Sequence, residues 1–341
     1  MKILITGGCG FVGSNLAIYL DKRFKKSKIS SLDNLIRKGS SINQKRLKNN
    51  KIKNYRYDIS NYNKINLLPK FDLIIDCCAE PAIELSKKDP DKVLKTNLIG
   101  TYNLLKKCLK DKSDFIFLSS SRVYSIEKLR NLVGSADFNK SIRIKKKIDE
   151  KFETTGPSSL YGFTKIASEK LIKEFFYMTK LKYLINRFGV IAGPWQFGKQ
   201  DQGFVPLWVA NHFLKKKLSY IGFNGQGNQV RDVLHIEDVC EIISLQIAHI
   251  RKINNKTFNI GGGPNNALSL KQLTKKCKNL TQNKIKFKKI KKTSIFDIPY
   301  YISDNSKIFK HYRWKPKKNL DRILNDIFFW LKQNKKVRNF F

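Results

Sequence analysis

The stretch that decides the fold runs KILITGGCGFVG, from Lys2 to Gly13. Its first five residues are mostly apolar and predict a strand over residues 2–6, and the residues after the glycines predict a helix over residues 11–24. Between strand and helix lies a turn with three evenly spaced glycines, Gly7, Gly10 and Gly13. Such a turn lets a dinucleotide pyrophosphate approach backbone N–H groups at the start of a helix. The motif alone is weak evidence, but its position between a strand and a helix predicts a dinucleotide-binding site.

Strand and helix patterns alternate through the rest of the first half. We expect strands over residues 28–32, 54–58, 71–78, 114–119 and 182–188, and helices over residues 91–110 and 158–179. This alternation predicts an α/β fold, a Rossmann-like doubly wound parallel sheet with helices on both faces. The second half is less regular, and there we expect a strand over residues 258–263, a helix over 270–278 capped by Ser269, and an amphipathic helix over 320–331.

Basic residues greatly outnumber acidic ones, since 68 Lys and Arg against 27 Asp and Glu give a net charge of +41. Such a charge can attract nucleic acid or an anionic surface. The basic residues are scattered, however, and no nucleic-acid motif accompanies them, so we favour the alternative that lysines fill solvated faces. We expect no nucleic-acid partner, and no membrane partner either, because no apolar run approaches the roughly 20 residues that span a bilayer.

The cysteines show no pattern typical of disulfides or zinc sites. They are Cys9, Cys77, Cys78, Cys108, Cys240 and Cys277. None forms a C-x-x-C pair, and several lie in apolar runs, so we expect reduced core residues and no metal site. The first residues predict a strand rather than a signal peptide, so we expect a cytoplasmic protein.

Two aspartates follow predicted strands at positions where they would meet a dinucleotide. Asp33 lies at the end of the second strand, the position of a carboxylate that binds the hydroxyls of the adenosine ribose. A carboxylate there favours NAD over NADP because it would repel a 2′-phosphate, although Arg37 and Lys38 lie nearby. Asp58 is expected to close the third strand, where the adenine edge would lie.

Tyr161 and Lys165 lie four residues apart in a predicted helix, which puts a phenol and an ammonium on one face. The ordinary tyrosine pKa of about 10 is too high for a base at neutral pH. An ammonium neighbour and a positive nicotinamide ring would lower that pKa, so that Tyr161 can take a proton from a substrate hydroxyl. Ser120 ends the fifth strand, at the edge of the sheet where ligands bind, and its hydroxyl would hold the substrate oxygen.

These residues resemble the extended short-chain dehydrogenases/reductases that act on nucleotide sugars, over nearly the whole chain. In the first half the resemblance rests on the glycine turn, the two aspartates, Ser120, the Tyr161/Lys165 pair and residues 97–101. In the second half it rests on Arg187, Gly193-Pro194 and residues 231–235, 259–262 and 314–316. Within the family, the blocks 193–203 and 227–235 most resemble the CDP-paratose 2-epimerase group.

The resemblance implies a division of the chain and a set of site residues. The division is a NAD-binding Rossmann domain over residues 1–186 and a smaller α/β domain over 187–341, mainly for the NDP-sugar, with segments around 230–245 returning to the first. The implied catalytic residues are Ser120, Tyr161 and Lys165. The implied cofactor contacts are Gly7, Gly10, Phe11, Val12, Gly13, Asp33, Asn34, Asp58, Ile59, Cys78, Ala79, Asn97, Tyr161, Lys165 and Val190. The implied substrate contacts are Ser120, Gln196, Gln202, Gly203 and Arg231, with Arg231 on the diphosphate. Such relatives commonly pair through the helices at 91–110 and 158–179, so we expect a homodimer.

The family contains epimerases, dehydratases, reductases and decarboxylases. Dehydratase relatives carry Asp-Glu directly after the active-site Ser or Thr, whereas this chain has Ser121 and Arg122. Elimination then lacks its acid and base, while removal and return of a hydride need only the Tyr, Lys and Ser set. We therefore expect an isomerase, a NAD-dependent epimerase of a nucleotide-diphosphate sugar, most like the CDP-paratose 2-epimerases. A 4-epimerase or a reductase is the alternative within the family, and a nonenzymatic dinucleotide-binding protein is the alternative from another class.

Three stretches depart from the pattern of the family. The segment 125–156 is short and rich in lysine, which could loosen sugar selectivity. Asp76-Cys77-Cys78-Ala79-Glu80 stands where many relatives have His-Leu-Ala-Ala, so Glu80 points into the site or satisfies the backbone of its own loop. Asp297 and the residues after it stand where many relatives place a second phosphate-binding arginine.

Overall fold

The computed structural model describes residues 1–81, 88–133, 146–199 and 202–341. These residues form two compact units, each assembled from three segments of the chain. The first unit comprises Met1–Val123, Ser159–Arg187 and Val239–Phe258, and the second comprises Tyr124–Ser158, Phe188–Asp238 and Asn259–Phe341.

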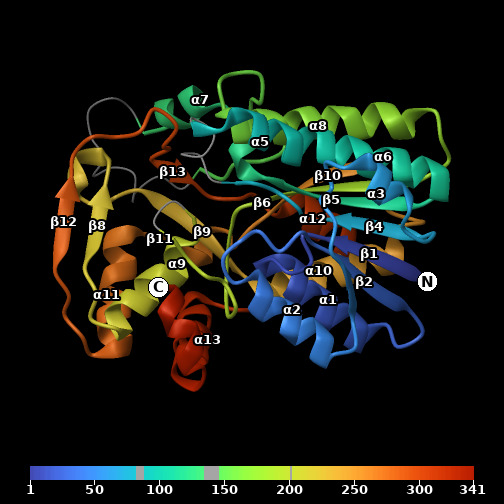
Figure 1. Ribbon diagram of the computed structural model, residues 1–341. Coiled ribbons are helices and arrows are strands. Elements are labelled where there is room, and N and C mark those ends of the chain that lie inside the picture. The colour runs from blue at the N-terminus through green and yellow to red at the C-terminus, as the bar shows by residue number, and fades with distance from the viewer. Residues whose placement is uncertain (82–87, 134–145, 200–201) are drawn as a thin grey trace. The chain divides into compact units, whose positions relative to one another are not determined.

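The first unit is built on a seven-stranded sheet (Figure 1). Its strands are β1 (Lys2–Thr6), β2 (Lys28–Leu32), β3 (Lys53–Tyr55), β4 (Leu73–Asp76), β5 (Asp114–Ser120), β6 (Tyr183–Phe188) and β10 (Lys256–Ile260). They lie in the order β10-β6-β5-β4-β1-β2-β3, and β1 runs parallel to both of its neighbours, β2 and β4. The chain therefore winds outward in both directions from β1, which confirms the predicted Rossmann-like doubly wound sheet. Ligands of such sheets bind where the order reverses, here between β1 and β4.

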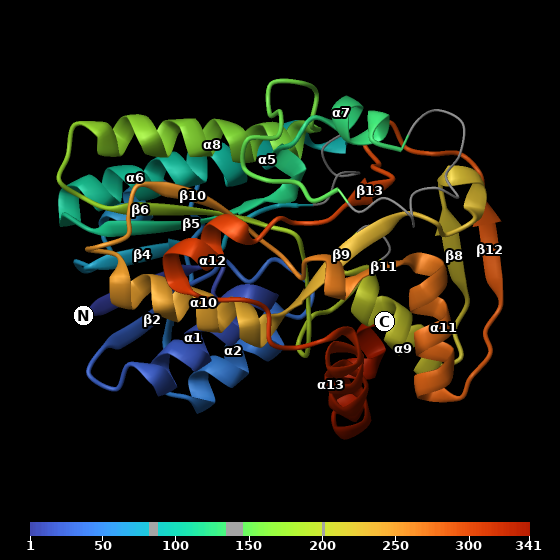
Figure 2. The ribbon, with the colours of Figure 1, turned by 180° about the vertical axis from the view of Figure 1, so that it is seen from behind.

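Helices cover both faces of this sheet. They are α1 (Phe11–Arg23), α2 (Ser40–Asn49), α3 (Tyr62–Asn66), α5 (Pro90–Leu94), α6 (Gly100–Asp111), α8 (Leu160–Tyr177) and α10 (Ile236–His249). Figures 1 and 2 show α6 and α8 on one face and α1, α2 and α10 on the other. Because both faces are covered, the central strands β1, β4 and β5 are largely apolar. Phe115 of β5, for example, is fully buried and lies 6.3 Å, between ring centroids, from Phe176 of α8.

The helix predicted over residues 91–110 is interrupted. A π-helical turn at Lys95–Ile99 separates α5 from α6. The turn carries Asn97, whose buried amide donates to the Glu80 carbonyl at 3.1 Å and to the Thr164 hydroxyl at 3.2 Å. Sequence periodicity cannot indicate such a turn, because its partners lie far away in the chain.

The second unit contains short strands and five α-helices among the described residues. The strands are β7 (Val190–Ala192), β8 (Leu218–Ile221), β9 (Val230–His235), β11 (Ala267–Ser269), β12 (Phe287–Ile290) and β13 (Tyr300–Tyr301). The helices are α7 (Ile126–Asn131), α9 (Phe204–Phe213), α11 (Leu270–Thr281), α12 (Ser306–Tyr312) and α13 (Leu320–Gln333). Strand β9 is central, because β7, β11 and β13 all pair with it, while β8 and β12 form a separate pair. The predicted cap at Ser269 is present as a capping box with Gln272.

Two further observations concern the chain as a whole. All six cysteines are free thiols, of which Cys77 and Cys78 are half-buried and the other four are buried. No helix in the described part of the chain is long and apolar enough to cross a membrane.

Candidate active site

The phenol and the ammonium of the Tyr161/Lys165 pair come from the first turns of α8. The helix begins after Ser159, whose hydroxyl accepts the Gly162 N–H at 3.2 Å and caps the first turn. Tyr161 is 9% exposed and Lys165 only 2% exposed, so both side chains turn toward the sheet rather than toward water. The predicted placement of both groups on one helix face agrees with this burial.

The Lys165 ammonium is held at the carboxyl end of β5. Its Nζ donates to the Leu118 carbonyl at 2.9 Å and lies 4.4 Å from the centroid of the Phe117 ring. A buried cation needs such partners, and the carbonyl oxygen and the ring face each stabilise its charge. The contact fixes the ammonium two residues before Ser120 on the same strand.

Ser120 is the last residue of β5 and is half-buried. Its Oγ accepts the Arg122 N–H at 3.1 Å, which closes the 3₁₀ turn at Ser121–Val123. Because the hydroxyl acts as acceptor in this bond, it keeps a hydrogen to donate to a substrate oxygen. The structure thus places Ser120 and the Lys165 ammonium at the carboxyl end of β5, with Tyr161 one helical turn before Lys165.

A buried network beside these residues is absent from the sequence predictions. The Glu169 carboxylate, which is fully buried, accepts the Ser119 hydroxyl at 2.6 Å and binds the Arg187 guanidinium through Nε and Nη2, the latter at 2.6 Å. Glu169 lies one turn after Lys165, and Ser119 directly precedes Ser120. The network therefore ties α8 to β5 next to Ser120 and the Tyr161/Lys165 pair. Two features of the sequence could have indicated this network. Glu169 lies four residues after Lys165 in the same helix, and Arg187 lies inside a largely apolar strand.

The glycine turn after β1 has the shape that a dinucleotide requires. Gly7 adopts a φ of +60°, and a Cβ at Gly13 would lie 2.3 Å from the Gly7 carbonyl oxygen. Helix α1 starts at Phe11, with Val12 and Gly13 in its first turn. The cap residue that precedes it is Gly10, which has no side chain to bond the first N–H groups of the helix. The backbone N–H groups of that turn are consequently available to an anionic ligand.

The loops after β2 and β3 carry the residues expected around adenosine. Asp33 accepts the Cys9 N–H at 3.0 Å and the Leu35 N–H at 2.8 Å, which ties its loop to the glycine turn. Burial raises the pKa of Asp33, although these bonds and Arg37 oppose that shift. The carboxylate oxygens retain lone pairs for ribose hydroxyls.

Asp58 does not close β3 as predicted, because the strand ends at Tyr55. It accepts the Asn34 amide at 2.8 Å and the Ser60 hydroxyl at 2.7 Å. Burial opposes its ionisation, but the bonds from Ser60 and Asn34 outweigh burial and lower the pKa of Asp58. The next residue, Ile59, is buried and packs so closely on Gly100 that a Cβ there would lie 2.4 Å from Ile59 Cδ1.

The loop after β4 contains the remaining predicted cofactor contacts of the first unit. The Cys78 N–H donates to the buried Asp76 carboxylate at 3.0 Å, and the Ala79 carbonyl accepts from Arg37 at 3.5 Å. Burial, reinforced by the Asp76 charge, raises the pKa of Cys78 well above its usual range, so this side chain is a neutral thiol. Asn97 joins this loop to α8 through the bonds given above. The Glu80 N–H donates to the Asn97 side chain, and the Glu80 carboxylate lies 3.6 Å from the Arg37 guanidinium.

The predicted substrate residues lie in the second unit, apart from Ser120. Arg231 on β9 donates to the carbonyls of Val230 at 2.8 Å and Ile298 at 2.6 Å, and its Nη2 lies 3.3 Å from the Asp297 carboxylate. The guanidinium therefore has a fixed orientation next to the stretch that departs from the family pattern.

The other predicted residues of the second unit lie around the start of α9 and on β7. The Gln196 amide donates to the Ile191 carbonyl at 3.2 Å, and Gln202 pairs with Lys199 in an isolated β-bridge. Gly203 precedes α9 with a φ of +75°, and Val190 pairs with Val233 of β9. Gln200 and Asp201, which belong to the block that resembles the CDP-paratose 2-epimerase group, lie outside the described residues, as do residues 134–145 of the short segment 125–156.

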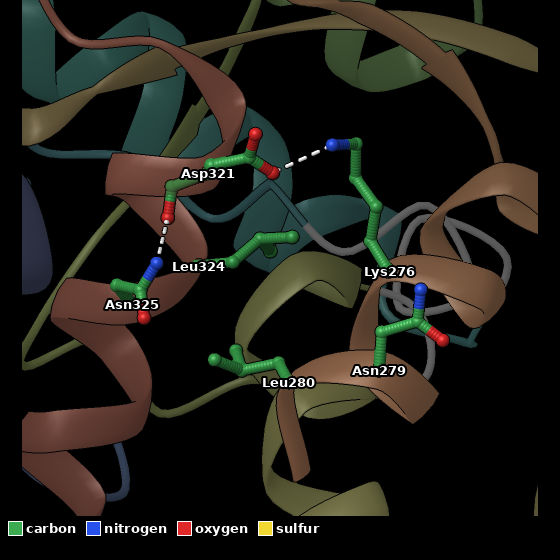
Figure 3. A pocket seen from close by; sticks show the side chains of 6 residues that line it. All are labelled: Lys276, Asn279, Leu280, Asp321, Leu324 and Asn325. Atoms are coloured by element: carbon green, nitrogen blue, oxygen red, sulfur yellow. Dashed lines mark hydrogen bonds and ion pairs between the residues drawn. The ribbon is translucent and has the colours of Figure 1, made fainter. Parts of the chain in front are cut away.

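A surface pocket in the second unit is unrelated to any predicted site residue (Figure 3). It is lined by Lys276, Asn279, Leu280, Asp321, Leu324 and Asn325, on α11 and α13. Lys276 and Asp321 already form an ion pair across it at 2.6 Å. Among the described residues no cluster of His, Cys, Asp and Glu could hold a metal ion.

The chain belongs to the NAD dependent epimerase/dehydratase family, whose model matches residues 3–261. This membership confirms the predicted NAD cofactor, and the glycine turn, the open N-terminus of α1 and Asp33 fit such a dinucleotide.

Individual relatives within the family differ in their reactions. The chain is 29% identical to CDP-paratose 2-epimerase of Salmonella typhi over 97% of this chain and 99% of that protein. It is 33% identical to dTDP-D-glucose 4,6-dehydratase of Dictyostelium discoideum, over 76% of this chain but only 58% of that protein. Among solved structures, UDP-glucose 4-epimerase of Thermotoga maritima with UDP-glucose superimposes with a TM-score of 0.78 and 26% identity, over 98% of this chain and 99% of that one. The comparisons thus identify the family and leave the reaction to be argued from residues.

Proposed function

We propose that the protein is a NAD-dependent epimerase of a nucleotide-diphosphate sugar, most like the CDP-paratose 2-epimerases. The observation that carries the proposal is the Lys165 ammonium, buried at the end of β5 between the Leu118 carbonyl and the Phe117 ring, one helical turn from Tyr161. A fixed cation beside a tyrosine suits a hydroxyl that takes up and returns a proton during a reaction. A protein that only binds a dinucleotide would have no use for this arrangement.

The residues of the first unit would hold the cofactor and move the proton. The glycine turn and the α1 N-terminus would bind the pyrophosphate, and Asp33 the adenosine ribose. When bound, NAD supplies a reversible acceptor for a hydride from the sugar carbon. Ser120 would donate a hydrogen bond to the reacting oxygen while Tyr161 removes its proton and later returns it. The keto sugar formed in this way must present its other face before the carbon is reduced again.

The residues after Ser120 favour epimerisation over dehydration. Where dehydratases of the family carry an acid and a base, this chain has Ser121 and Arg122 in the 3₁₀ turn after β5. Neither side chain can serve as an acid that protonates a leaving hydroxyl near neutral pH together with a base that takes a carbon-bound proton. The full-length similarity to a 2-epimerase supports C2 as the carbon, and Arg231 would bind the substrate diphosphate.

The proposal is tested by the product. The purified protein is incubated with CDP-paratose and, separately, with UDP-glucose, and products are followed by NMR and mass spectrometry. Inversion at C2 without net consumption of NADH supports the proposal. Inversion at C4 supports the alternative epimerase, and loss of one water supports a dehydratase. Stoichiometric reduction of added NAD, with release of a keto sugar, supports a reductase running in reverse. No turnover on any nucleotide sugar, with salt-sensitive binding to nucleic acid, supports the nonenzymatic alternative.

The role of Tyr161 has a matched control on the same helix. Tyr161→Phe should retain bound NAD and the fold but lose turnover by roughly 100-fold or more, because the general base is absent. Tyr177→Phe removes a hydroxyl from a side chain that is 86% exposed at the other end of α8 and should be neutral. Near-normal turnover in Tyr161→Phe would show that the proton goes to another group.

We also propose that the protein is a homodimer in the cytoplasm. Helices α6 and α8 expose apolar side chains to solvent, with Leu109 41% exposed and Phe163 52%. A second copy would cover such side chains. Size-exclusion chromatography with light scattering tests the dimer, and a monomer at all concentrations excludes it.

A further inference from the structure

An ion pair joins the loop after β2 to the loop after β4 in the first unit. Nη1 of Arg37 lies 3.6 Å from Oε1 of Glu80 and also donates to the Ala79 carbonyl at 3.5 Å. The Glu80 side chain is only 13% exposed, and that of Arg37 is 37% exposed. The contact therefore lies at the surface of the unit, with its acidic end largely buried.

The position of this pair follows from the order of the strands. Strand β1 lies between β2 and β4, and the glycine turn leaves its carboxyl end. Both loops already touch that turn, because the Cys9 N–H binds Asp33 and a Cβ at Gly7 would lie 3.0 Å from the Cys77 carbonyl oxygen. Arg37 and Glu80 thus connect the two loops across the end of β1, where the dinucleotide pyrophosphate would lie.

The two partners are held very differently. The Glu80 N–H donates to Asn97 Oδ1 at 2.7 Å, and Asn97 Nδ2 donates to the Glu80 carbonyl at 3.1 Å, so the buried Asn97 clamps the backbone of Glu80 on both sides. Arg37 instead reaches Glu80 through a long, half-exposed side chain. Glu80 is a fixed anchor, and the Arg37 side chain can swing away by rotamer changes alone.

We infer that Arg37 and Glu80 form a strap over the dinucleotide cradle that slows the release of NAD. A bound dinucleotide at the glycine turn would lie beneath the strap, and its departure would require the ion pair to open. The inference needs only the NAD site and not the sugar reaction, so it can fail while the proposed epimerase activity stands, and the reverse.

The test measures cofactor release rather than turnover. Purified protein is loaded with NAD, and the release rate is followed by stopped-flow fluorescence after addition of excess 1,N6-etheno-NAD, without any sugar. Glu80→Gln and Arg37→Met should each release NAD about two- to fivefold faster, the range expected for a partly exposed ion pair. The double variant should release NAD no faster than Arg37→Met alone, because that change already removes both the ion pair with Glu80 and the bond to Ala79.

Salt and a charge-matched variant separate the strap from general electrostatics. Release from the wild type should accelerate between low and high NaCl, whereas release from the double variant should change less. Lys45→Met removes one positive charge from an exposed site on α2 and should leave the release rate unchanged. Unchanged release in both single variants, or additive effects in the double variant, would overturn the inference.

Discussion

Two arginine–carboxylate pairs, one in each unit, hold their partners in contrasting ways. In the first unit, Arg187 binds Glu169 through Nε at 2.9 and 3.1 Å and through Nη2 at 2.6 Å, and the two side chains are 7% and 0% exposed. In the second unit, Arg231 meets the Asp297 carboxylate at 3.3 Å, with side chains 11% and 28% exposed. Asp297 also accepts the N–H of the residue that follows it.

The difference indicates different tasks. Both carboxylate oxygens of Glu169 are occupied by Arg187 or the Ser119 hydroxyl, so the carboxylate has no room for another partner. The ion pair fixes α8 against β6, and the Ser119 bond fixes it against β5. Arg231 is oriented mainly by two backbone carbonyls, while its carboxylate partner is more distant and partly solvated. That partner can be exchanged for another anion without moving the guanidinium, which suits a group proposed to bind a diphosphate.

The largest effect is expected from breaking the buried pair. Glu169→Ala leaves the Arg187 charge buried without its carboxylate and should lower the free energy of unfolding by about 3–5 kcal/mol. The matched change Asp297→Ala should cost less than about 1 kcal/mol, because its contact is partly exposed. Urea denaturation followed by circular dichroism measures both.

Equal losses of unfolding free energy in Glu169→Ala and Asp297→Ala would show that the two ion pairs contribute alike to stability. If Glu169→Ala does not fold, Glu169→Gln keeps the shape of the side chain and can still accept the Ser119 hydroxyl. It should then show an intermediate loss in the same measurement.

A second prediction concerns Arg231. Arg231→Met should weaken the binding of CDP and UDP about 10- to 100-fold, because one charge-assisted hydrogen bond contributes about 1.5–3 kcal/mol. Arg231→Lys keeps the positive charge but loses the paired N–H donors of the guanidinium, so its affinity for CDP and UDP should lie between those of the wild type and Arg231→Met. Isothermal titration calorimetry measures the dissociation constants, and unchanged values in Arg231→Met would mean that the diphosphate binds elsewhere.

The contrast between the two pairs also marks what a sequence can reveal. The bounds of β1 and β2 were predicted to the residue, because a short apolar run next to a turn is a local signal. The placement of Tyr161 and Lys165 on one helix was predicted for the same reason, since their spacing is local. These features depend on residues within a few positions of one another.

Features that depend on distant residues were missed. The π-turn around Asn97 needs Glu80 and Thr164, and the Glu169 network needs Ser119 and Arg187. For Glu80 two roles were open from the sequence, and the structure shows an ion pair with Arg37 that neither role included. Hydrophobic periodicity reports only on neighbouring residues, so it cannot predict contacts between residues that are distant in the sequence and are brought together by the fold.

The smallest effect is expected at Asp297, where the sign of the change in CDP affinity shows whether the carboxylate competes with the ligand or orients Arg231. Asp297→Asn removes a negative charge 3.3 Å from Arg231 but keeps the size of the side chain. If the carboxylate competes with the diphosphate, the variant should bind CDP about two- to fivefold more tightly, with a smaller gain at high salt. Asp321→Asn removes the same charge from an exposed position on α13 and should leave binding unchanged. If Asp297→Asn instead binds CDP more weakly, the carboxylate orients Arg231, and the second pair resembles the first in being part of the framework rather than an exchangeable partner.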